Sequence, residues 1–345
     1  MILQSEPVCK SPTPEETWQQ ALAGSIRDPK ELFELLELDM KQLPAAIQAD
    51  KKFSLRVPHA FVRRISKRDW NDPLLRQILP VSQELDFQSG YTTDPLDEKN
   101  TNSLPGLIHK YHGRVLLIVS GGCAINCRYC FRRHFPYAEN NPGRQQWPDT
   151  IKYIANDNSI SEVIFSGGDP LAASNSLLAG LVEQLEEIPH VKTLRIHTRM
   201  PIMIPQRIDN ECLSWLTKGR LNPVMVVHCN HPNELDEDTG IALSKLKNAG
   251  VTLLNQSVLL AGVNDDAPTL RNLSERLFEF GVLPYYLHLL DKVEGAAHFD
   301  VDKDTAAAIV RELLATLPGY LVPKLVKEYA GAKSKTPISS FLQPN

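Results

Sequence analysis

The chain has 345 residues, of which 42% are hydrophobic and 23% are charged, proportions that are ordinary for a soluble protein with a sizeable core. The formal net charge of −4, without any basic block, argues against a general binder of nucleic acids or of membrane surfaces. No segment approaches the roughly 20 apolar residues that a membrane span needs. The N-terminus has no secretory signal pattern, so we expect a cytoplasmic protein.

The first part of the chain, residues 1–105, is expected to form a helical region appended to the rest. Short helical patterns are broken by prolines, and three of them begin with a capping residue next to a proline: Thr13-Pro14, Asp28-Pro29 and Asp72-Pro73. Such pairs are typical of helix N-termini. No alternating strand pattern stands out in this region.

Six short apolar runs follow, and helical patterns separate most of them. The runs cover residues 115–120, 163–168, 193–198, 224–229, 252–257 and 285–290, and the clearest helical patterns cover 176–188, 236–250 and 269–281. This alternation predicts βαβ units and a parallel sheet. Because the runs are mostly apolar throughout, we expect strands buried on both faces. The fold class predicted for residues 106–300 is α/β, a partial (β/α)6 barrel.

Each predicted strand ends on a polar residue. These residues are Ser120, Ser166, His197, His228, Gln256 and Asp291. In barrels of this type the C-terminal rim of the strands carries the active site. Although strand ends are often polar simply because loops begin there, six such residues together predict one shared cavity.

Three of the six cysteines follow the first predicted strand, in the spacing C-x3-C-x2-C: Cys123, Cys127 and Cys130. Clustered thiols in a cytoplasmic chain indicate metal or redox chemistry rather than disulfides. Three thiolates can hold three irons of a [4Fe-4S] cluster and leave the fourth iron open to a ligand. A zinc site completed by His134 is the alternative, but the spacing is not a usual zinc pattern.

This cysteine motif, with Tyr129 before the third cysteine, resembles the signature of the radical S-adenosylmethionine superfamily. The resemblance implies that the open iron binds S-adenosylmethionine, whose reductive cleavage gives a radical that abstracts hydrogen from substrate. It also implies a glycine-rich turn near the methionine part of that cofactor. Gly167, Gly168 and Asp169, at the end of the second strand, match this turn. His228 and Gln256 are candidates for further contacts to S-adenosylmethionine.

Over residues 65–340 the chain resembles lysine 2,3-aminomutase more specifically. The matching stretches are DPLLRQILP (72–80), DPLDEKNTNSLPGLIHKYHGRVLL (94–117), CRYCFRR (127–133), SGGDPL (166–171), HCNHPNE (228–234), NQSVLLAGVND (255–265), PYYLHLLD (284–291) and GAKSKTP (331–337). The resemblance implies pyridoxal 5'-phosphate as a second cofactor, which needs an imine-forming lysine. Lys335, in the C-terminal segment 301–345, matches the family's lysine, and Lys333 is the alternative.

The same resemblance assigns residues to an L-lysine substrate. Arg132 matches the arginine that binds the substrate carboxylate, a task suited to a planar guanidinium. Asp291 matches one of two aspartates that bind the side-chain ammonium, whereas the other is replaced by Glu328, which keeps the charge and adds a methylene. Lys110 and Arg114 are candidates for the cofactor phosphate.

Two departures from the degradative lysine aminomutases indicate a branch of the family. The sequence ends ten residues after Lys335, and Asp266 stands where those enzymes have a cysteine of an intersubunit zinc site. We therefore expect no such zinc site, and the family's oligomeric assembly does not carry over. The chain most resembles the short bacterial aminomutase that supplies (R)-β-lysine for modification of elongation factor P by a separate lysyl ligase.

Other functions compatible with these residues are an aminomutase acting on glutamate or another amino acid, an iron–sulfur electron-transfer protein, and a binding partner of elongation factor P with vestigial chemistry. Asp291 and Glu328 argue against glutamate, because two acids repel a distal carboxylate. The leading hypothesis requires an external electron donor such as flavodoxin or ferredoxin.

Overall fold

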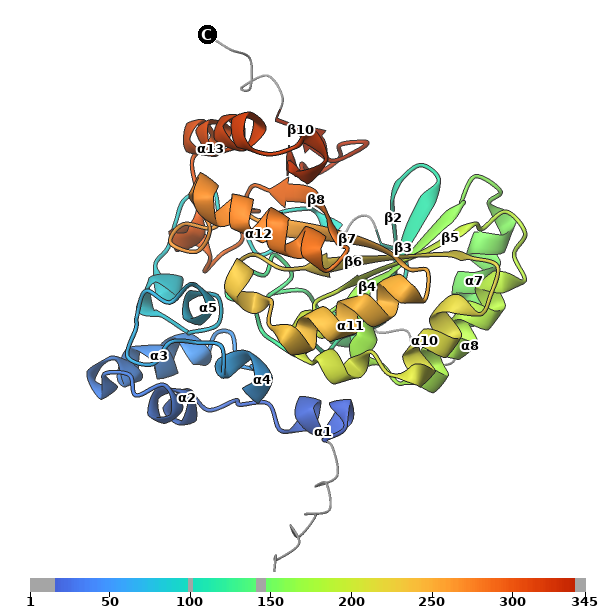
Figure 1. The fold of residues 1–345 in the computed structure, drawn as a ribbon. Coiled ribbons are helices and arrows are strands. Elements are labelled where there is room, and N and C mark those ends of the chain that lie inside the picture. Colours follow the sequence, from blue (N-terminus) through green and yellow to red (C-terminus); the bar gives the residue numbers. More distant parts are fainter. Residues whose placement is uncertain (1–15, 99–101, 141–146, 339–345) are drawn as a thin grey trace, which may run out of the picture.

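The computed structural model describes residues 16–98, 102–140 and 147–338. Within these residues, one sheet of ten strands follows the order of the sequence from β1 to β10 (Figure 1). The strands are β1 (Asn102–Leu104), β2 (Leu107–Tyr111), β3 (Arg114–Ser120), β4 (Glu162–Gly167), β5 (Thr193–Thr198), β6 (Asn222–His228), β7 (Thr252–Val258), β8 (Leu283–His288), β9 (Lys324–Lys327) and β10 (Thr336–Pro337).

All six predicted strands are present, as β3 to β8, and neighbouring members of this set pair in parallel. The predicted fold class is therefore confirmed. The sheet is larger than predicted, because β9 adds a further parallel strand next to β8. The two edges are antiparallel: β1 and β2 precede β3, and β10 pairs with β9.

The expectation that the strands are buried on both faces is met along β4, where five of six residues are buried, but not along β5. In β5, Leu194 and Ile196 are fully buried, whereas Arg195 and His197, which alternate with them, are only half-buried and face a cavity. Strand residues alternate between the two faces. One face of the sheet therefore packs into the core, and the other lines an internal space.

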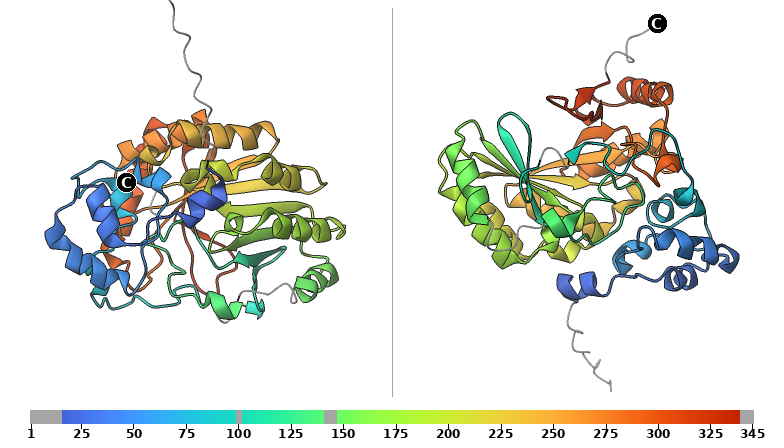
Figure 2. Two further views of the ribbon diagram at one scale, coloured as in Figure 1. Left: turned by 90° about the horizontal axis from the view of Figure 1, so that it is seen from below. Right: turned by 180° about the vertical axis from the view of Figure 1, so that it is seen from behind.

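Helices cover the outer face of the sheet, with α11 and α12 crossing it in Figure 1 and the same layer visible in the two views of Figure 2. The longer helices are α7 (Trp147–Asn156), α8 (Asn175–Glu186), α10 (Asn210–Thr217), α11 (Glu237–Asn248), α12 (Ala267–Glu279) and α13 (Lys303–Thr316). Aspartates begin α10 to α13 by accepting hydrogen bonds from the first turn, the usual role of an N-cap.

The N-terminal region contains α1 (Trp18–Ala23), α2 (Pro29–Leu35), α3 (Leu43–Asp50), α4 (His59–Val62) and α5 (Pro73–Arg76). Asp28 and Asp72 cap α2 and α5, as predicted. The helix start predicted at Thr13 lies outside the described residues, and the first described helix is capped by Thr17. Figure 1 shows α2 to α5 gathered at one side of the sheet.

The domain limits after residues 105 and 300 stay predictions. Among the described residues, every helix is too short or too polar to cross a membrane.

Candidate active site

A cavity of about 520 Å³ opens on the inner face of the sheet. Five of the six polar strand ends line it, from Ser166 on β4 to Asp291 after β8. Ser120 is the exception, because it borders a shallow hollow next to Tyr137 instead. The three clustered cysteines and Lys335 also line the cavity. The fold therefore brings together residues that are far apart in the sequence: Cys123 and Lys335, for example, are 212 positions apart.

The cysteine loop is held from behind by the N-terminal region. The backbone N–H of Asn126 donates to the carbonyl of Arg56 at 2.9 Å, and that of Arg128 donates to the carbonyl of Gln77 at 3.0 Å. The Arg128 guanidinium also donates to the carbonyl of Phe53 at 2.7 Å. A region expected to be an appendage thus forms one wall of the site.

A buried ion cluster reinforces this wall. Glu84 accepts two hydrogen bonds from Arg128, at 2.8 and 2.6 Å, and one from Arg133, at 2.7 Å. All three side chains are almost fully buried. Arg128 and Arg133 flank the third cysteine in sequence, so the carboxylate fixes both ends of the segment around Cys130.

The glycine-rich turn packs against the backbone that leads into the cysteine loop. A Cβ on Gly167, whose φ is +125°, would lie 2.4 Å from the carbonyl oxygen of Ser120, and one on Gly168 would lie 2.5 Å from that of Gly122. The N–H of Gly168 donates to the carbonyl of Ser120 at 2.7 Å. These glycines are needed for the close approach of two loops, and their expected contact with S-adenosylmethionine stays a prediction.

Asp169 is buried and accepts hydrogen bonds from the protein itself. Its carboxylate oxygens accept from the N–H of Leu171 at 3.0 Å, the hydroxyl of Thr198 at 2.7 Å and the N–H of Arg199 at 2.7 Å. Asp169 therefore joins the glycine-rich turn to the end of β5. It also lines the cavity, and direct cofactor binding by this residue stays a prediction.

The three thiols fit an iron–sulfur cluster in donor type and in position. Burial raises the pKa of Cys130 to about 11, and Cys127 adds to the rise. Burial likewise raises the pKa of Cys123, with the other two thiols adding to it. The thiols are thus close enough to repel one another as thiolates, and bound metal ions would remove that penalty.

Within the described part of the chain, no three His, Cys, Asp or Glu side chains converge on one metal position. A [4Fe-4S] cluster does not require such convergence, because each thiolate binds a different iron.

Arg132 lies in the cavity with its guanidinium already engaged. Its Nε and Nη2 donate to the two carboxylate oxygens of Glu98, at 2.7 and 2.8 Å, and Nη1 donates to the Ser166 hydroxyl at 3.3 Å. Although burial lowers the pKa of Arg132, Glu98 raises it further, so the net shift is upward. The guanidinium is thus a fixed cation with a bidentate carboxylate partner. Sequence reasoning gave Glu98 no role.

Lys335 and Glu328 form an ion pair, with Nζ 2.7 Å from Oε2. Glu328 also accepts from the Tyr111 hydroxyl at 3.0 Å. Burial opposes ionisation of Glu328, but Lys335 outweighs it, and the pKa of Glu328 falls to about 2. Lys335 lines the cavity, which favours it over Lys333 as the cofactor lysine.

Lys110 joins the two carboxylates. Its Nζ lies 3.6 Å from an oxygen of Glu98 and 3.6 Å from an oxygen of Glu328. Cations and carboxylates therefore alternate through successive contacts, in the order Lys335, Glu328, Lys110, Glu98 and Arg132. Lys110 is occupied by carboxylates here, and its contact with a cofactor phosphate stays a prediction.

Asp291 differs from Glu328 in its charge state. Burial raises the pKa of Asp291 to about 7, with repulsion from Glu328 adding to the rise and Lys335 opposing it. The two acids were expected to share a substrate ammonium. The pKa values of the two acids thus shift in opposite directions: Glu328 is held as a carboxylate, whereas Asp291 ionises only around neutral pH. A further cation nearby would favour the charged form of Asp291.

Several buried histidine nitrogens face the cavity without a partner among the described residues. They are the Nε2 atoms of His197, His228 and His288. Burial lowers the pKa of His228 to about 3, so its ring is neutral. Buried polar atoms are normally hydrogen-bonded, so these three nitrogens indicate that ligands complete the site.

Arg114 also lines the cavity, with its guanidinium 5.0 Å from the centroid of the Tyr111 ring, and Gln256 contributes to the lining. Arg195, paired with Glu162 at 2.8 Å, is a second cation of the lining that sequence reasoning missed because it is inside an apolar run. Arg114 and Arg195 fit a phosphate in charge, and the roles of Arg114 and Gln256 in cofactor binding stay predictions.

Comparisons with known proteins identify relatives of this chain. Residues 117–215 match the model of the Radical SAM superfamily. The chain is 53% identical to an L-lysine 2,3-aminomutase of Escherichia coli, covering 95% of this chain and 96% of that protein. It is 51% identical to an L-lysine 2,3-aminomutase of Haemophilus influenzae, over 97% and 98%.

The chain belongs to the lysine 2,3-aminomutase family. Its members are isomerases of the radical S-adenosylmethionine superfamily that use a [4Fe-4S] cluster, S-adenosylmethionine and pyridoxal phosphate. A relative of the same name from Clostridium subterminale is 34% identical, over 93% of this chain and 77% of that protein. Among solved structures, the radical SAM enzyme coproporphyrinogen III oxidase (HemN) from Escherichia coli matches with a TM-score of 0.38 and 12% identity, over 65% of this chain and 54% of that one.

Proposed function

We propose that this protein converts L-lysine to β-lysine by moving the α-amino group to the β-carbon. The observation that carries the proposal is that one cavity contains the cysteine loop, Arg132, the acid pair Asp291 and Glu328, and Lys335. This set supplies a place for the cluster, a cation for the substrate carboxylate, two acids for the side-chain ammonium and an amine for pyridoxal phosphate.

When bound, the cluster with S-adenosylmethionine supplies the radical that abstracts hydrogen, and pyridoxal phosphate supplies a carbonyl that holds the migrating nitrogen. Cys123, Cys127 and Cys130 would hold the cluster. Lys335 would hold pyridoxal phosphate through its amine. An external one-electron donor such as flavodoxin or ferredoxin would supply the electron.

Glu328 holds Lys335 in place within the cavity. The Lys335 amine donates to Glu328 at 2.7 Å, and this amine is the group that would form an imine with a carbonyl. We infer that Glu328 orients the Lys335 amine until the cofactor enters. Once Lys335 holds the cofactor, Glu328 is available to the side-chain ammonium of lysine.

Arg132 and the two acids would then orient the substrate from both ends. The Arg132 guanidinium suits a carboxylate, as its bidentate contact with Glu98 shows, so the substrate carboxylate would displace or share that partner. Asp291 and Glu328 favour a distal ammonium over a distal carboxylate, which supports lysine over glutamate.

The decisive experiment is anaerobic incubation of the reconstituted protein with S-adenosylmethionine, a reductant and L-lysine. We expect β-lysine to form, and the K335A and C127A variants to make none. A β-amino product from another amino acid but not from lysine would overturn the substrate assignment. Absence of 5'-deoxyadenosine from the wild-type reaction would overturn the radical mechanism. K335A should also lose pyridoxal absorbance while keeping its cluster, a loss that a simple electron-transfer protein would not show.

We further propose that the product is (R)-β-lysine used to modify elongation factor P. The support is the resemblance to the short bacterial enzymes, together with the nearly complete mutual coverage with the Escherichia coli relative. In a bacterium that lacks its own lysine 2,3-aminomutase but keeps the lysyl ligase, expression of this chain should restore β-lysylated elongation factor P, as measured by mass spectrometry. Restored β-lysine without modified elongation factor P would contradict this finer assignment only.

A further inference from the structure

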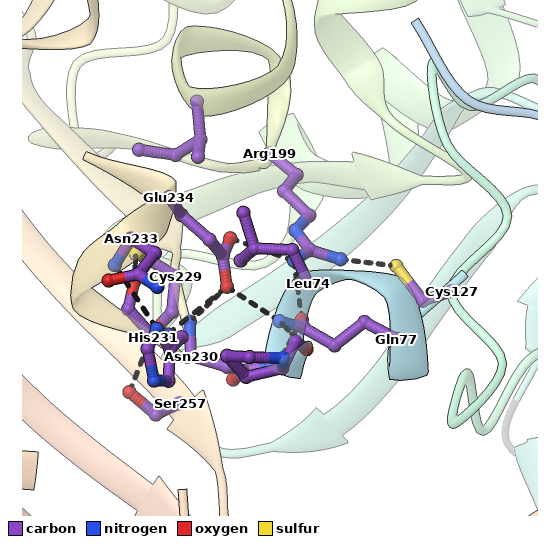
Figure 3. A network of polar contacts seen from close by, with 12 residues as sticks. Leu74, Gln77, Cys127, Arg199, Cys229, Asn230, His231, Asn233, Glu234 and Ser257 are labelled. Carbon is purple, nitrogen blue, oxygen red and sulfur yellow. Dashed lines mark hydrogen bonds and ion pairs between the residues drawn. The ribbon is translucent and has the colours of Figure 1, made fainter. Parts of the chain in front are cut away.

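Arg199 connects a cluster cysteine to a buried carboxylate. Its Nη1 donates to the sulfur of Cys127 at 2.9 Å, and its Nη2 donates to Glu234 at 2.8 Å and to Gln77 at 2.7 Å. Figure 3 shows the guanidinium between the Cys127 sulfur on one side and the Glu234 carboxylate on the other. No sequence motif pointed to this arginine.

The geometry of this contact is imposed by the fold rather than by a flexible side chain. Arg199 directly follows β5, and its N–H is held by Asp169 at 2.7 Å. The side chain is 5% exposed, and it lies between the rings of Phe61 and Tyr129, 5.7 and 5.8 Å from their centroids. The guanidinium therefore has little freedom to turn away from the sulfur.

Glu234 is held equally firmly on the side away from the cysteine. It is fully buried and accepts from the N–H groups of Asn230 and His231, at 3.0 and 3.1 Å, and from the Gln77 amide at 3.0 Å. Although burial opposes ionisation, Arg199 lowers the pKa of Glu234 below its usual range. A fixed cation thus faces the cysteine, and a fixed anion lies behind it.

We propose that Arg199 is a positioning residue that raises the reduction potential of the iron–sulfur cluster through its hydrogen bond to Cys127, and that Glu234 tempers this effect. The inference rests on the proposed function, in which Cys127 binds the cluster. Uptake of one electron increases the negative charge on the cluster and its thiolates. A cationic donor stabilises the reduced form more than the oxidised form, and hydrogen bonds to the sulfurs are a known determinant of cluster potential.

Substitutions of the two residues are predicted to shift the reduction potential in opposite directions, which a merely structural role would not produce. In R199M the charged donor is lost, so reduction becomes less favourable. We expect about a tenfold change in the one-electron equilibrium, a potential lower by about 59 mV. In E234Q the opposing charge is lost while an acceptor oxygen remains, so the potential should rise. R199K keeps the charge but not the planar fork of the guanidinium. Its reduction potential should lie between those of R199M and wild type.

The test is a redox titration of the reconstituted protein with low-potential mediators as the electron source, monitored by electron paramagnetic resonance without lysine. R207M is the matched control, because Arg207 is also fully buried but donates to the carbonyl of Leu171. The cysteine that Arg207 contacts is Cys212, which is not one of the three clustered cysteines. Its potential should equal that of wild type.

Unshifted potentials in R199M and E234Q, or shifts of both in the same direction, would overturn the inference. If R199M takes up no cluster, the reduction potentials of R199K and E234Q are compared with that of wild type instead. Their predicted shifts still differ in sign, so the comparison remains a test. A wild-type protein without any cluster signal would instead contradict the proposed function, so the two failures are distinguishable.

Discussion

Glu328 is the residue on which recognition of the substrate amine most depends. It stands where the family resemblance implies an aspartate, and in the structure it pairs with Lys335, Tyr111 and Lys110. The longer side chain therefore places its carboxylate against a lysine of the protein. A substrate ammonium would replace this internal cation, so the carboxylate charge matters more than the side-chain length.

E328Q should raise KM for lysine by about tenfold to hundredfold, since a hydrogen bond to a charged group contributes roughly 1.5–3 kcal/mol. The measurement is anaerobic steady-state kinetics with lysine as the varied substrate. E328D, which restores the family's aspartate and keeps the charge, is the matched control and should stay within about tenfold of wild type, well under the cost of a lost charged contact. An unchanged KM in E328Q would exclude Glu328 from substrate binding.

Asp291 predicts a pH dependence of lysine capture. Its pKa is about 7 because burial, and then Glu328, disfavour its ionised form. Below pH 7 the neutral acid attracts an ammonium weakly, and above pH 7 the carboxylate attracts it strongly. The value of kcat/KM should therefore rise roughly tenfold per pH unit below about 7 and level off above it, because this profile reports the free enzyme. D291N should lose this inflection, and an inflection that survives in D291N would assign it to another group.

The residues found from sequence and those missed differ in how locally they are encoded. The cysteine loop has a spacing that few other sites share, and Lys335 lies in a distinctive small-residue segment. Glu98 and Arg199 have no such pattern, because a charged residue beside a loop or strand end usually faces solvent. Their roles depend on contacts with Arg132 and Cys127, which only the folded chain brings together.

At the scale of elements, apolar runs predicted the parallel core of the sheet but not its edges. The runs behind β3 to β8 each cover about six mostly apolar residues, and those behind β3 to β6 are rich in β-branched residues. In contrast, β9 has four residues and β10 has two, too few for a periodic pattern. Glu328 directly follows β9, and Lys335 directly precedes β10. Two of the unpredicted strands, β9 and β10, therefore position the proposed cofactor lysine and its carboxylate partner.

The turn after β4 predicts a specific effect of a single methyl group. A Cβ at Gly168 would meet the Gly122 carbonyl at 2.5 Å, and backbone cannot move aside as a side chain can. G168A should lower the free energy of unfolding by about 1–3 kcal/mol, the usual cost of overpacking, and should reduce iron uptake by displacing the cysteine loop. Thermal unfolding of the protein before reconstitution and its iron content afterwards are the measurements.

Gly180, within α8, is the matched control for G168A. A Cβ there meets nothing within 4 Å, so G180A should stabilise the helix by roughly 0.5–1 kcal/mol without changing iron content. Equal iron content in G168A and G180A would show that the turn does not position the cysteines.

At the scale of the whole molecule, the N-terminal region and the sheet share the site. Gln77 contacts both Arg199 and the backbone of the cysteine loop, and Arg64 donates to Asp236 at 2.6 Å, at the start of α11. Sequence reasoning separated these parts because their secondary structure differs. These two contacts link side chains that are more than 100 positions apart. A single sequence contains no local pattern that indicates such contacts.

Glu84 offers a test of this shared architecture. E84A would leave the Arg128 and Arg133 guanidiniums buried without their carboxylate, and removing one partner of a buried ion pair costs about 3–5 kcal/mol. We expect a loss of that size in the free energy of unfolding, together with poorer cluster uptake, because both arginines flank Cys130. Denaturant unfolding and iron content measure the two effects.

The matched control for E84A is E279A, which breaks the exposed pair between Arg276 and Glu279 on α12. Exposed pairs contribute about 1 kcal/mol or less, so E279A should stay close to wild type in stability and keep its full iron content. An E84A protein that loses stability but binds iron normally would show that the helical region supports the fold without shaping the cysteine loop. Normal stability in E84A would instead contradict the buried ion cluster itself.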